Sequence, residues 1–221
     1  MPLNKQKGNM YSWISHTWNT VKGECEHDCS YCYMKSRGKL NPVRFDEKEL
    51  NTDLEINNKI FVGSSNDIFS ESIPDQWIKD TLLHCMQYPG NEYFFQTKNV
   101  ERIFELPAYL PSNNCTIGTT IETNRHYRGL SKAPSVEIRA NLLGKILDKS
   151  TYLTIEPIID FDLEPMIDLV IQANPGFINI GADSKGNGLP EPSREKVDKL
   201  IDELSDLGFE IKLKSNLNRL K

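Results

Sequence analysis

Short runs of β-branched and aromatic residues alternate with longer amphipathic segments along this chain of 221 residues. Buried parallel strands are short and rich in such residues, so these runs predict strands that are covered on both faces. The predicted strands are residues 13–18, 59–64, 92–97, 115–121, 152–156, 177–180 and 209–213. Strands that alternate with helices in this way indicate an α/β fold with a parallel sheet.

The segments between the strands carry apolar residues at steps of three or four positions, which is typical of helices with one buried face. The predicted helices are residues 74–88, 100–104, 135–147, 164–172 and a last helix that begins at Ser193 and ends at Gly208. Ser72 is the expected cap of the first helix. An open doubly wound sheet and a partial (β/α) barrel both fit this pattern. In either fold the functional site lies at the carboxyl ends of the strands.

The composition, with 38% hydrophobic and 26% charged residues, is that of an ordinary globular protein. No apolar run reaches the roughly 18 residues of a membrane helix, and the polar N-terminus lacks the apolar stretch of a signal peptide. We therefore expect one cytoplasmic domain over residues 1–221 that does not contact a membrane. The net charge of −5 argues against broad electrostatic capture of nucleic acid. A local basic patch, for which a solvated surface is the simpler interpretation, could include Arg125, His126, Arg128, Lys132 and Arg139.

Three of the five cysteines, Cys25, Cys29 and Cys32, fall within eight residues and have the spacing C-x3-C-x2-C. An odd number of cysteines in a chain without a signal peptide does not indicate a disulfide framework. Thiolates are soft ligands that suit Fe–S clusters and zinc. Three thiolates would leave one iron of a four-iron cluster open to a substrate or cofactor, so the spacing favours a reactive Fe–S centre.

A zinc site is the alternative interpretation of the three cysteines. His27 or His16 could complete a Cys₃His set of ligands. Zinc ribbons and fingers usually bind zinc between two short motifs of closely spaced Cys or His residues, and the sequence offers no second motif of this kind. Cys85 falls in an amphipathic helix and Cys115 begins a strand, so both are interpreted as core residues, because buried cysteine behaves as a small hydrophobe.

The cysteine loop, residues 23–34, resembles the signature of the radical SAM superfamily, C-x3-C-x-aromatic-C, with Tyr31 in the aromatic position. It also follows the first predicted strand, as in that superfamily. The resemblance implies a partial (β/α) TIM-like barrel of about six or seven parallel strands, with a [4Fe–4S] cluster held by the three cysteines. It further implies that the cluster chelates S-adenosylmethionine and cleaves it to methionine and a 5′-deoxyadenosyl radical, which abstracts hydrogen from a substrate. An external flavodoxin-like or ferredoxin-like electron donor is implied as well.

Several shorter motifs are similar, in their order, to those of a phage- and prophage-encoded radical SAM-like family whose substrate is not established. These motifs are Thr17-Trp18-Asn19, residues 61–69, Gln96-Thr97-Lys98, Ile155-Glu156-Pro157 and Lys214. Their order is more distantly similar to the spore photoproduct lyase group, which acts on damaged thymines in DNA. These resemblances imply that a nucleic-acid base or nucleotide is modified or repaired. A small molecule bound with the help of a partner is the alternative. The acidic net charge counts mildly against the nucleic-acid substrate.

Polar residues after the second predicted strand are candidates for cofactor binding, because the carboxyl ends of parallel strands lie at one rim. These residues are Ser64, Ser65, Asn66 and Asp67. Their oxygen atoms could accept hydrogen bonds from the methionyl ammonium group. The glycine-rich pattern that the superfamily has here is reduced to Gly63. A turn or a helix cap explains the same residues.

Residues at the other strand ends complete the predicted site. Lys98 could bind a carboxylate, although an exposed lysine is an equally simple interpretation. Thr120 and Glu122 end the fourth strand and are candidates for cofactor binding, Glu122 through the ribose hydroxyls. Gly181 could let adenine approach the backbone closely. The candidate catalytic residues are Lys98, Glu156 and Lys214.

Overall fold

A computed structural model describes residues 2–6, 8, 10–106, 109–111 and 114–221, and its main feature is one eight-stranded sheet in the order β1-β2-β5-β6-β7-β8-β9-β10. β1 (Asn4–Lys5) pairs antiparallel with β2, and every other pair in this sheet is parallel. The parallel strands are β2 (His16–Trp18), β5 (Lys59–Val62), β6 (Glu92–Gln96), β7 (Cys115–Thr120), β8 (Ser150–Ile155), β9 (Phe177–Ile180) and β10 (Ile211–Leu213). They follow one another in chain order, without the reversal of a doubly wound sheet. The predicted partial barrel of parallel strands is therefore confirmed.

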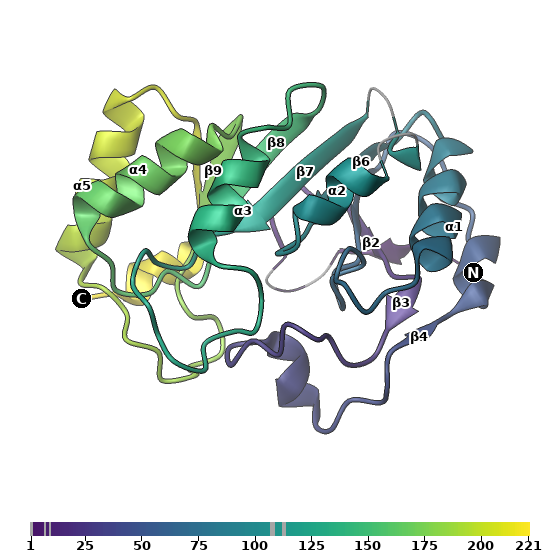
Figure 1. The fold of residues 1–221 in the computed structure, drawn as a ribbon, viewed down its shortest axis with the longest axis horizontal. Helices are drawn as coiled ribbons and strands as arrows, with labels where there is room; N and C mark the ends of the chain where they lie inside the picture. The colour runs from purple at the N-terminus through teal and green to yellow at the C-terminus, as the bar shows by residue number, and fades with distance from the viewer. Residues whose placement is uncertain (1, 7, 9, 107–108, 112–113) are drawn as a thin grey trace.

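In the part of the chain that the structure describes, five α-helices connect the parallel strands and cover the outside of the sheet. They are α1 (Asp75–Met86), α2 (Glu101–Glu105), α3 (Val136–Leu143), α4 (Leu163–Ala173) and α5 (Arg194–Asp206). Figure 1 shows them following one another across the molecule, from α1 beside the N-terminus to α5 beside the C-terminus. α3 packs on β7 and on α4, and α4 packs on α5. None of the described helices is long and apolar enough to cross a membrane.

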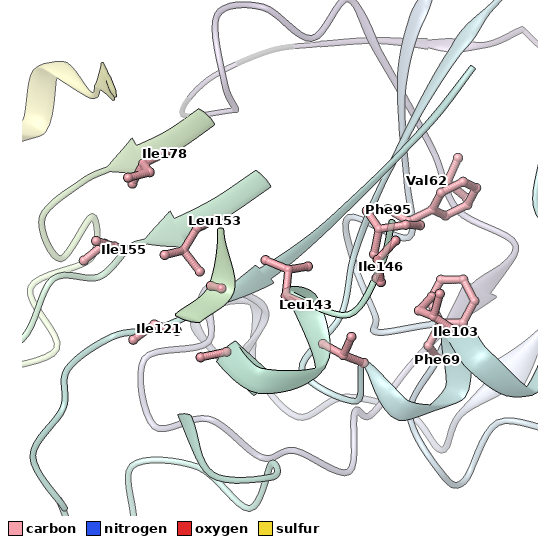
Figure 2. Packing of buried hydrophobic residues seen from close by; sticks show 14 of the residues in the cluster. Val62, Phe69, Phe95, Ile103, Ile121, Leu143, Ile146, Leu153, Ile155 and Ile178 are labelled. Carbon is pink, nitrogen blue, oxygen red and sulfur yellow. The ribbon is translucent and has the colours of Figure 1, made fainter. Parts of the chain in front are cut away.

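Alternate residues of the strands point to opposite faces of the sheet and form two separate cores. In β5, Ile60 and Val62 belong to the large core under the helices, whereas Phe61 between them belongs to a smaller inner cluster. Figure 2 shows the large core, in which Leu143 and Ile146 lie with residues of the strands. Full burial of each such side chain stabilises the folded state by about 1.5–3 kcal/mol relative to an exposed position.

The inner cluster fills the first inward positions of the strands with aromatic rings. Trp13 stacks on Tyr11 with 5.1 Å between ring centroids, and its ring lies 4.7 Å from that of Phe94 and 5.3 Å from that of Phe177. The backbone turns here, because the Ile14 N–H donates to the Tyr11 carbonyl at 3.0 Å. The predicted strand 13–18 therefore begins only at His16, since the residues before it close the barrel from inside.

The cysteine loop lies on an excursion from the barrel that a small ribbon closes. β3 (Val21–Lys22) pairs antiparallel with β4 (Arg44–Phe45), so the loop starts and returns at one place. Gly23 has a φ of 106°, and a Cβ atom on it would lie 2.5 Å from the Pro42 carbonyl oxygen. Only glycine, which has no side chain, fits where the start and the return of the loop pass this close to each other. The excursion also contains a 3₁₀ helix, η1 (Tyr33–Arg37). Further 3₁₀ helices in the described residues include η2 (Glu47–Asn51) and η4 (Ser215–Arg219).

The predicted helices are all present, with corrections at their ends. Ser193 caps α5 by accepting from the Lys196 N–H at 3.3 Å, as predicted. The prediction for Ser72 is wrong, because Pro74 is the N-cap of α1 and the Ser72 N–H donates to Glu26 instead. α3 ends at Leu143, four residues before the predicted end at residue 147, and its C-cap Gly144 lies where α4 passes close by. A Cβ atom on that glycine would lie 2.1 Å from the Gln172 carbonyl oxygen.

The structure confirms that Cys85 and Cys115 belong to the core. Both side chains are buried in the large core between sheet and helices, with exposed fractions of 0% and 4%. Burial raises the pKa of the Cys115 thiol to about 12. These two cysteines are therefore neutral core residues, clearly separated in environment from the three of the cysteine loop.

Gly118→Ala is expected to destabilise the barrel, because this glycine leaves room for an inner aromatic ring. Gly118 is in register with Tyr152, and a Cβ atom on it would lie 2.2 Å from Cζ of that ring. The overpacking should lower the free energy of unfolding by about 1–3 kcal/mol, measured by urea denaturation. Gly90→Ala is the control, since its Cβ would meet Ile56 at an ordinary 3.6 Å. Equal losses in the two variants would contradict this packing argument.

Candidate functional site

A cavity of about 640 Å³ lies at the carboxyl ends of the parallel strands and brings together most of the predicted site residues. The predicted residues that line it are Cys25, Cys29, Tyr31, Cys32, Ser64, Ser65, Asn66, Asp67, Lys98, Thr120, Glu156 and Lys214. The other two predicted residues, Glu122 and Gly181, are buried behind this lining. Segments far apart in the chain thus meet in one cavity, as expected for the functional rim of a (β/α) barrel.

The three cysteines of the loop line the same cavity with different exposure. Cys29 is buried, with 8% of its surface exposed, whereas Cys25 and Cys32 are partly exposed. Burial and the charge of Asp67 raise the pKa of the Cys25 thiol to about 11, so a metal must displace its proton. Among the described residues, no group of three His, Cys, Asp or Glu side chains is gathered as the ligands of a single metal ion.

Asp67 fastens the cysteine loop to the ends of β5 and β6. Its Oδ2 accepts from His27 Nε2 at 2.8 Å, from Thr97 Oγ1 at 3.0 Å and from the Lys98 N–H at 2.8 Å. Its Oδ1 accepts from the Phe69 N–H at 3.0 Å. Burial alone would raise the pKa of Asp67, but the hydrogen bond and charge of His27 lower it below the usual range. The carboxylate therefore already has four donors, and its predicted contact with an ammonium group stays a prediction.

Glu122 fastens the loop a second time, through Tyr31. This carboxylate has 1% of its surface exposed and accepts from the Tyr31 hydroxyl and, at 3.1 Å, from Arg139. Lys98 Nζ lies 3.7 Å from it. Burial alone would raise the pKa of Glu122, but the charges of Arg139 and Lys98 and the hydrogen bonds lower it to about 2. Its predicted contact with ribose stays a prediction, whereas its role in anchoring Tyr31 is visible.

The predicted basic patch is divided between different environments. Arg139 is buried and also donates to the Thr120 carbonyl. Arg125 pairs with Asp160 and Asp162 on the surface. Arg125 therefore agrees with the simpler interpretation of a solvated surface. For Arg139 that interpretation is wrong, because its guanidinium is buried against Glu122.

The segment after β5 is shaped by amide side chains. Asn19 Oδ1 accepts from Ser64 Oγ at 3.1 Å, from the Ser65 N–H at 2.9 Å and from Ser65 Oγ at 3.1 Å. Asn66 donates through Nδ2 to two backbone carbonyls at the start of the cysteine loop. Its Oδ1 is buried and has no hydrogen-bond partner among the described residues. Because Asn66 lines the cavity, this oxygen is an acceptor in need of a donor.

Glu156 and Lys214, two of the candidate catalytic residues, form a half-enclosed ion pair with 2.8 Å between Oε1 and Nζ. Lys214 Nζ also lies 5.0 Å from the centroid of the Tyr11 ring. Gly181 makes room for the pair, since a Cβ atom on it would lie 2.8 Å from Glu156 Cδ and 3.1 Å from Lys214 Cδ. The predicted approach of adenine to Gly181 stays untested. The third candidate, Lys98, lies apart from this pair, beside Glu122.

Gln96 and Tyr11 line the cavity without having been predicted. Gln96 Oε1 accepts from the hydroxyls of Tyr11 and Tyr152 at 3.4 and 3.2 Å, and Nε2 donates to Thr120 Oγ1 at 2.9 Å. The alternation of side chains along β6 could have predicted Gln96, because it lies two positions before the predicted site residue Lys98 and residues two apart point to the same face. No local pattern marks Tyr11, whose place depends on the turn that folds the N-terminal segment into the barrel.

Comparison with known proteins places the chain in a family and a fold. Residues 9–174 match the family described as "Protein of unknown function (DUF5131)". The chain belongs to this family. No curated protein matches its sequence. The larger part of the barrel and the whole cysteine loop lie within the matched residues.

Solved structures of radical SAM enzymes share the fold at low sequence identity. A single-residue variant of spore photoproduct lyase has a TM-score of 0.69 and 12% identity, over 95% of this chain and 79% of that chain. Another variant, with bound AdoMet and dinucleoside spore photoproduct, has a TM-score of 0.61 and 12% identity over 91% and 66% of the two chains. SuiB of Streptococcus suis, bound to S-adenosylmethionine, has a TM-score of 0.59 and 11% identity, over 90% of this chain and 50% of that chain. The radical SAM type of barrel is thus confirmed as the fold of this DUF5131 protein, whereas its resemblance to a phage family stays a prediction.

Glu122→Gln is expected to destabilise the protein in a pH-dependent way. The pKa of Glu122 in the fold is about 2, below the value of about 4.3 in an unfolded chain, so the ionised carboxylate stabilises the fold above that value. This stabilisation is lost as the pH falls toward the folded pKa. The variant should lose about 3 kcal/mol near neutral pH, and the difference from wild type should shrink below about pH 4.

Urea denaturation from about pH 7 to pH 3 measures this difference. Glu92→Gln is the control, because its carboxylate is exposed and lies 3.4 Å from exposed Lys59. This variant should change the free energy of unfolding by less than about 1 kcal/mol. A loss in Glu122→Gln that does not vary with pH would show that the charge of Glu122 is not the cause.

Proposed function

We propose that this protein is a radical SAM enzyme that holds a [4Fe–4S] cluster through Cys25, Cys29 and Cys32 and uses it to cleave S-adenosylmethionine. The observation that carries the proposal is that these three thiols line one cavity at the carboxyl-terminal rim of a parallel partial barrel. Thiolates are the ligands that Fe–S clusters take. The fold is shared with proteins that bind S-adenosylmethionine, which supports the same cofactor here.

The residues around the thiols fit this pair of cofactors. The cavity, of about 640 Å³, has the size of a small-molecule site. Asn66 Oδ1 is a buried acceptor without a partner, and an ammonium group such as that of S-adenosylmethionine supplies a strong donor. When bound and reduced, the cluster would supply the electron that splits the cofactor into methionine and a 5′-deoxyadenosyl radical. An external donor, flavodoxin-like or ferredoxin-like, would provide that electron.

The chain itself would bind the cofactor, orient it and keep water away. Lys214 and Glu156 present one cation and one carboxylate to the cavity, which can pair with the charges of an amino-acid moiety. The aromatic rings of the inner cluster close the barrel below the cavity, so a substrate would enter from the rim. A radical formed there would be shielded from the opposite side, and exclusion of side reactions is the protein's main share in such chemistry.

A nucleic-acid base or nucleotide, modified or repaired, is the substrate we propose. The likeness in fold to spore photoproduct lyase supports it, since one of those structures holds a dinucleoside spore photoproduct. It agrees with the distant similarity of the motifs in the sequence. Two exposed cations, Arg37 and Lys185, are among the residues that line the cavity, and a phosphate group could contact them.

Anaerobic reconstitution tests the cofactor. Wild-type protein should take up about four irons with sulfide per chain and, with dithionite and S-adenosylmethionine, form 5′-deoxyadenosine. Cys29→Ala should lose most of the iron and all of this product, because one of three ligands is missing. Cys115→Ala is the matched control, since that cysteine is buried in the large core. This variant should keep the iron and the formation of 5′-deoxyadenosine.

Stoichiometric zinc without sulfide in the wild-type protein would contradict the proposal and support the zinc alternative. A zinc site that used His27 would have to replace the 2.8 Å hydrogen bond between that imidazole and Asp67. Equal iron contents in Cys29→Ala and Cys115→Ala would also count against ligation by the loop.

Salt dependence tests the substrate class. Phosphate contacts release counterions, so binding of a single-stranded oligonucleotide should weaken about tenfold or more between roughly 50 and 200 mM salt for about three contacts. Fluorescence anisotropy with the reconstituted protein measures this affinity. An affinity that does not change with salt would contradict recognition through phosphates and favour a small uncharged substrate.

A further inference from the structure

Ser131 lies beside one of the three loop thiols, although it is 102 residues away in the sequence. Its Oγ is 3.3 Å from Cys29 Sγ, within hydrogen-bonding distance for sulfur. Cys29 is the most buried of the three thiols, with 8% of its surface exposed. A hydrogen bond to this sulfur is therefore shielded from competing water, which strengthens it.

Two backbone hydrogen bonds fix the position of Ser131 from both sides. The residue before it, Leu130, accepts from the Ser30 N–H at 2.9 Å, and the residue after it, Lys132, donates to the His27 carbonyl at 2.7 Å. The loop between β7 and α3 is thereby fastened to the cysteine loop at the residues that flank Cys29. This docking brings the Ser131 side chain beside that of Cys29.

The hydrogen bonds of the hydroxyl are complete only while Cys29 keeps its proton. Ser131 Oγ accepts from the Ala133 N–H at 3.1 Å and donates to the His27 carbonyl at 3.2 Å. The Cys29 thiol can then donate to the remaining lone pair of Oγ. In this arrangement the hydroxyl, the thiol and the His27 carbonyl all have hydrogen-bond partners.

Ligation removes the thiol proton to solvent and turns the sulfur into a negatively charged acceptor. The Ser131 hydroxyl hydrogen can then rotate from the His27 carbonyl to Cys29 Sγ without moving a heavy atom. The His27 carbonyl loses little, because it keeps the Lys132 N–H at 2.7 Å. A charged acceptor binds a hydrogen more strongly than a neutral carbonyl that already has a donor, so the rotation is favourable.

We propose that Ser131 is a positioning residue of the cluster: its hydroxyl donates to the Cys29 thiolate and raises the reduction potential of the centre. The inference rests on the cluster under the proposed function. Reduction adds one electron from the external donor, and no bond to Ser131 forms or breaks. Part of the added charge resides on the sulfur ligands, so a donor aimed at one of them stabilises the reduced state. The loop after β7 thus forms a second wall of the cluster site.

Redox titration of reconstituted protein, followed by electron paramagnetic resonance of the reduced cluster, tests the inference. Ser131→Ala should disfavour reduction roughly three- to tenfold, which for one electron is about 30–60 mV to more negative potential. Ser131→Thr keeps the hydroxyl and should keep the wild-type potential. Ser30→Ala is the matched control, because it makes the same change on an exposed residue next to Cys29 and leaves the backbone N–H in place.

A wild-type potential in Ser131→Ala at full iron content would overturn the inference. Should that variant fail to take up iron, the wild-type protein still decides. Resonance Raman spectra in H₂O and D₂O should show a shift of the Fe–S(Cys) vibrations if a hydroxyl hydrogen bonds to the thiolate, and identical spectra would overturn the inference. Absence of iron and sulfide from the wild-type protein would instead contradict the proposed function, so the two failures are distinct.

Discussion

The buried carboxylate of Asp67 is the interaction on which the geometry of the site depends. It accepts hydrogen bonds from His27 of the cysteine loop and from Phe69 of its own segment after β5. It also accepts hydrogen bonds from Thr97 and Lys98 at the end of β6. A buried carboxylate without such partners would be strongly unfavourable, so these segments cannot separate without exposing or protonating it. This polar connection holds the cysteine loop against the barrel, together with the hydrogen bond from Tyr31 to Glu122.

The cavity exists because the inward side of the strands changes character along its length. In β6 the inward Phe94 belongs to the aromatic cluster, whereas Gln96 two positions later lines the cavity. In β8 the same step leads from Tyr152 to Thr154, and then to Glu156 just beyond the strand. Large rings therefore seal the amino-terminal half of the barrel, and smaller polar groups leave space in the other half. A residue pattern of period two thus determines which half of the barrel contains the cavity.

The fold was largely predictable from the sequence because both cores follow regular patterns. The strand 177–180 has the predicted bounds, and Ser193 begins α5 as its capping chemistry indicates. What the sequence could not show depends on contacts between distant segments. The strand predicted from residue 13 is shorter because Trp13 turns inward to fill the barrel, and α3 ends early because Gly144 meets α4. The positions of the strand ends predicted most of the residues that line the cavity. They did not predict that Glu122 would lie behind the lining and accept a hydrogen bond from Tyr31.

The spacing of the cysteines specifies the kind of ligand, whereas the surroundings of those ligands come from elsewhere in the chain. The contacts that orient the loop join residues 40 positions apart for His27 and Asp67, and 91 apart for Tyr31 and Glu122. A local motif can therefore be kept while the properties of the proposed centre change, because hydrogen bonds and buried charges around sulfur ligands influence the reduction potential of a cluster. In a (β/α) barrel these surroundings come from loops that follow different strands. Under the proposed function, the reactivity of the centre could thus be adjusted at the loop after β7 or the end of β5 without altering the cysteine loop itself.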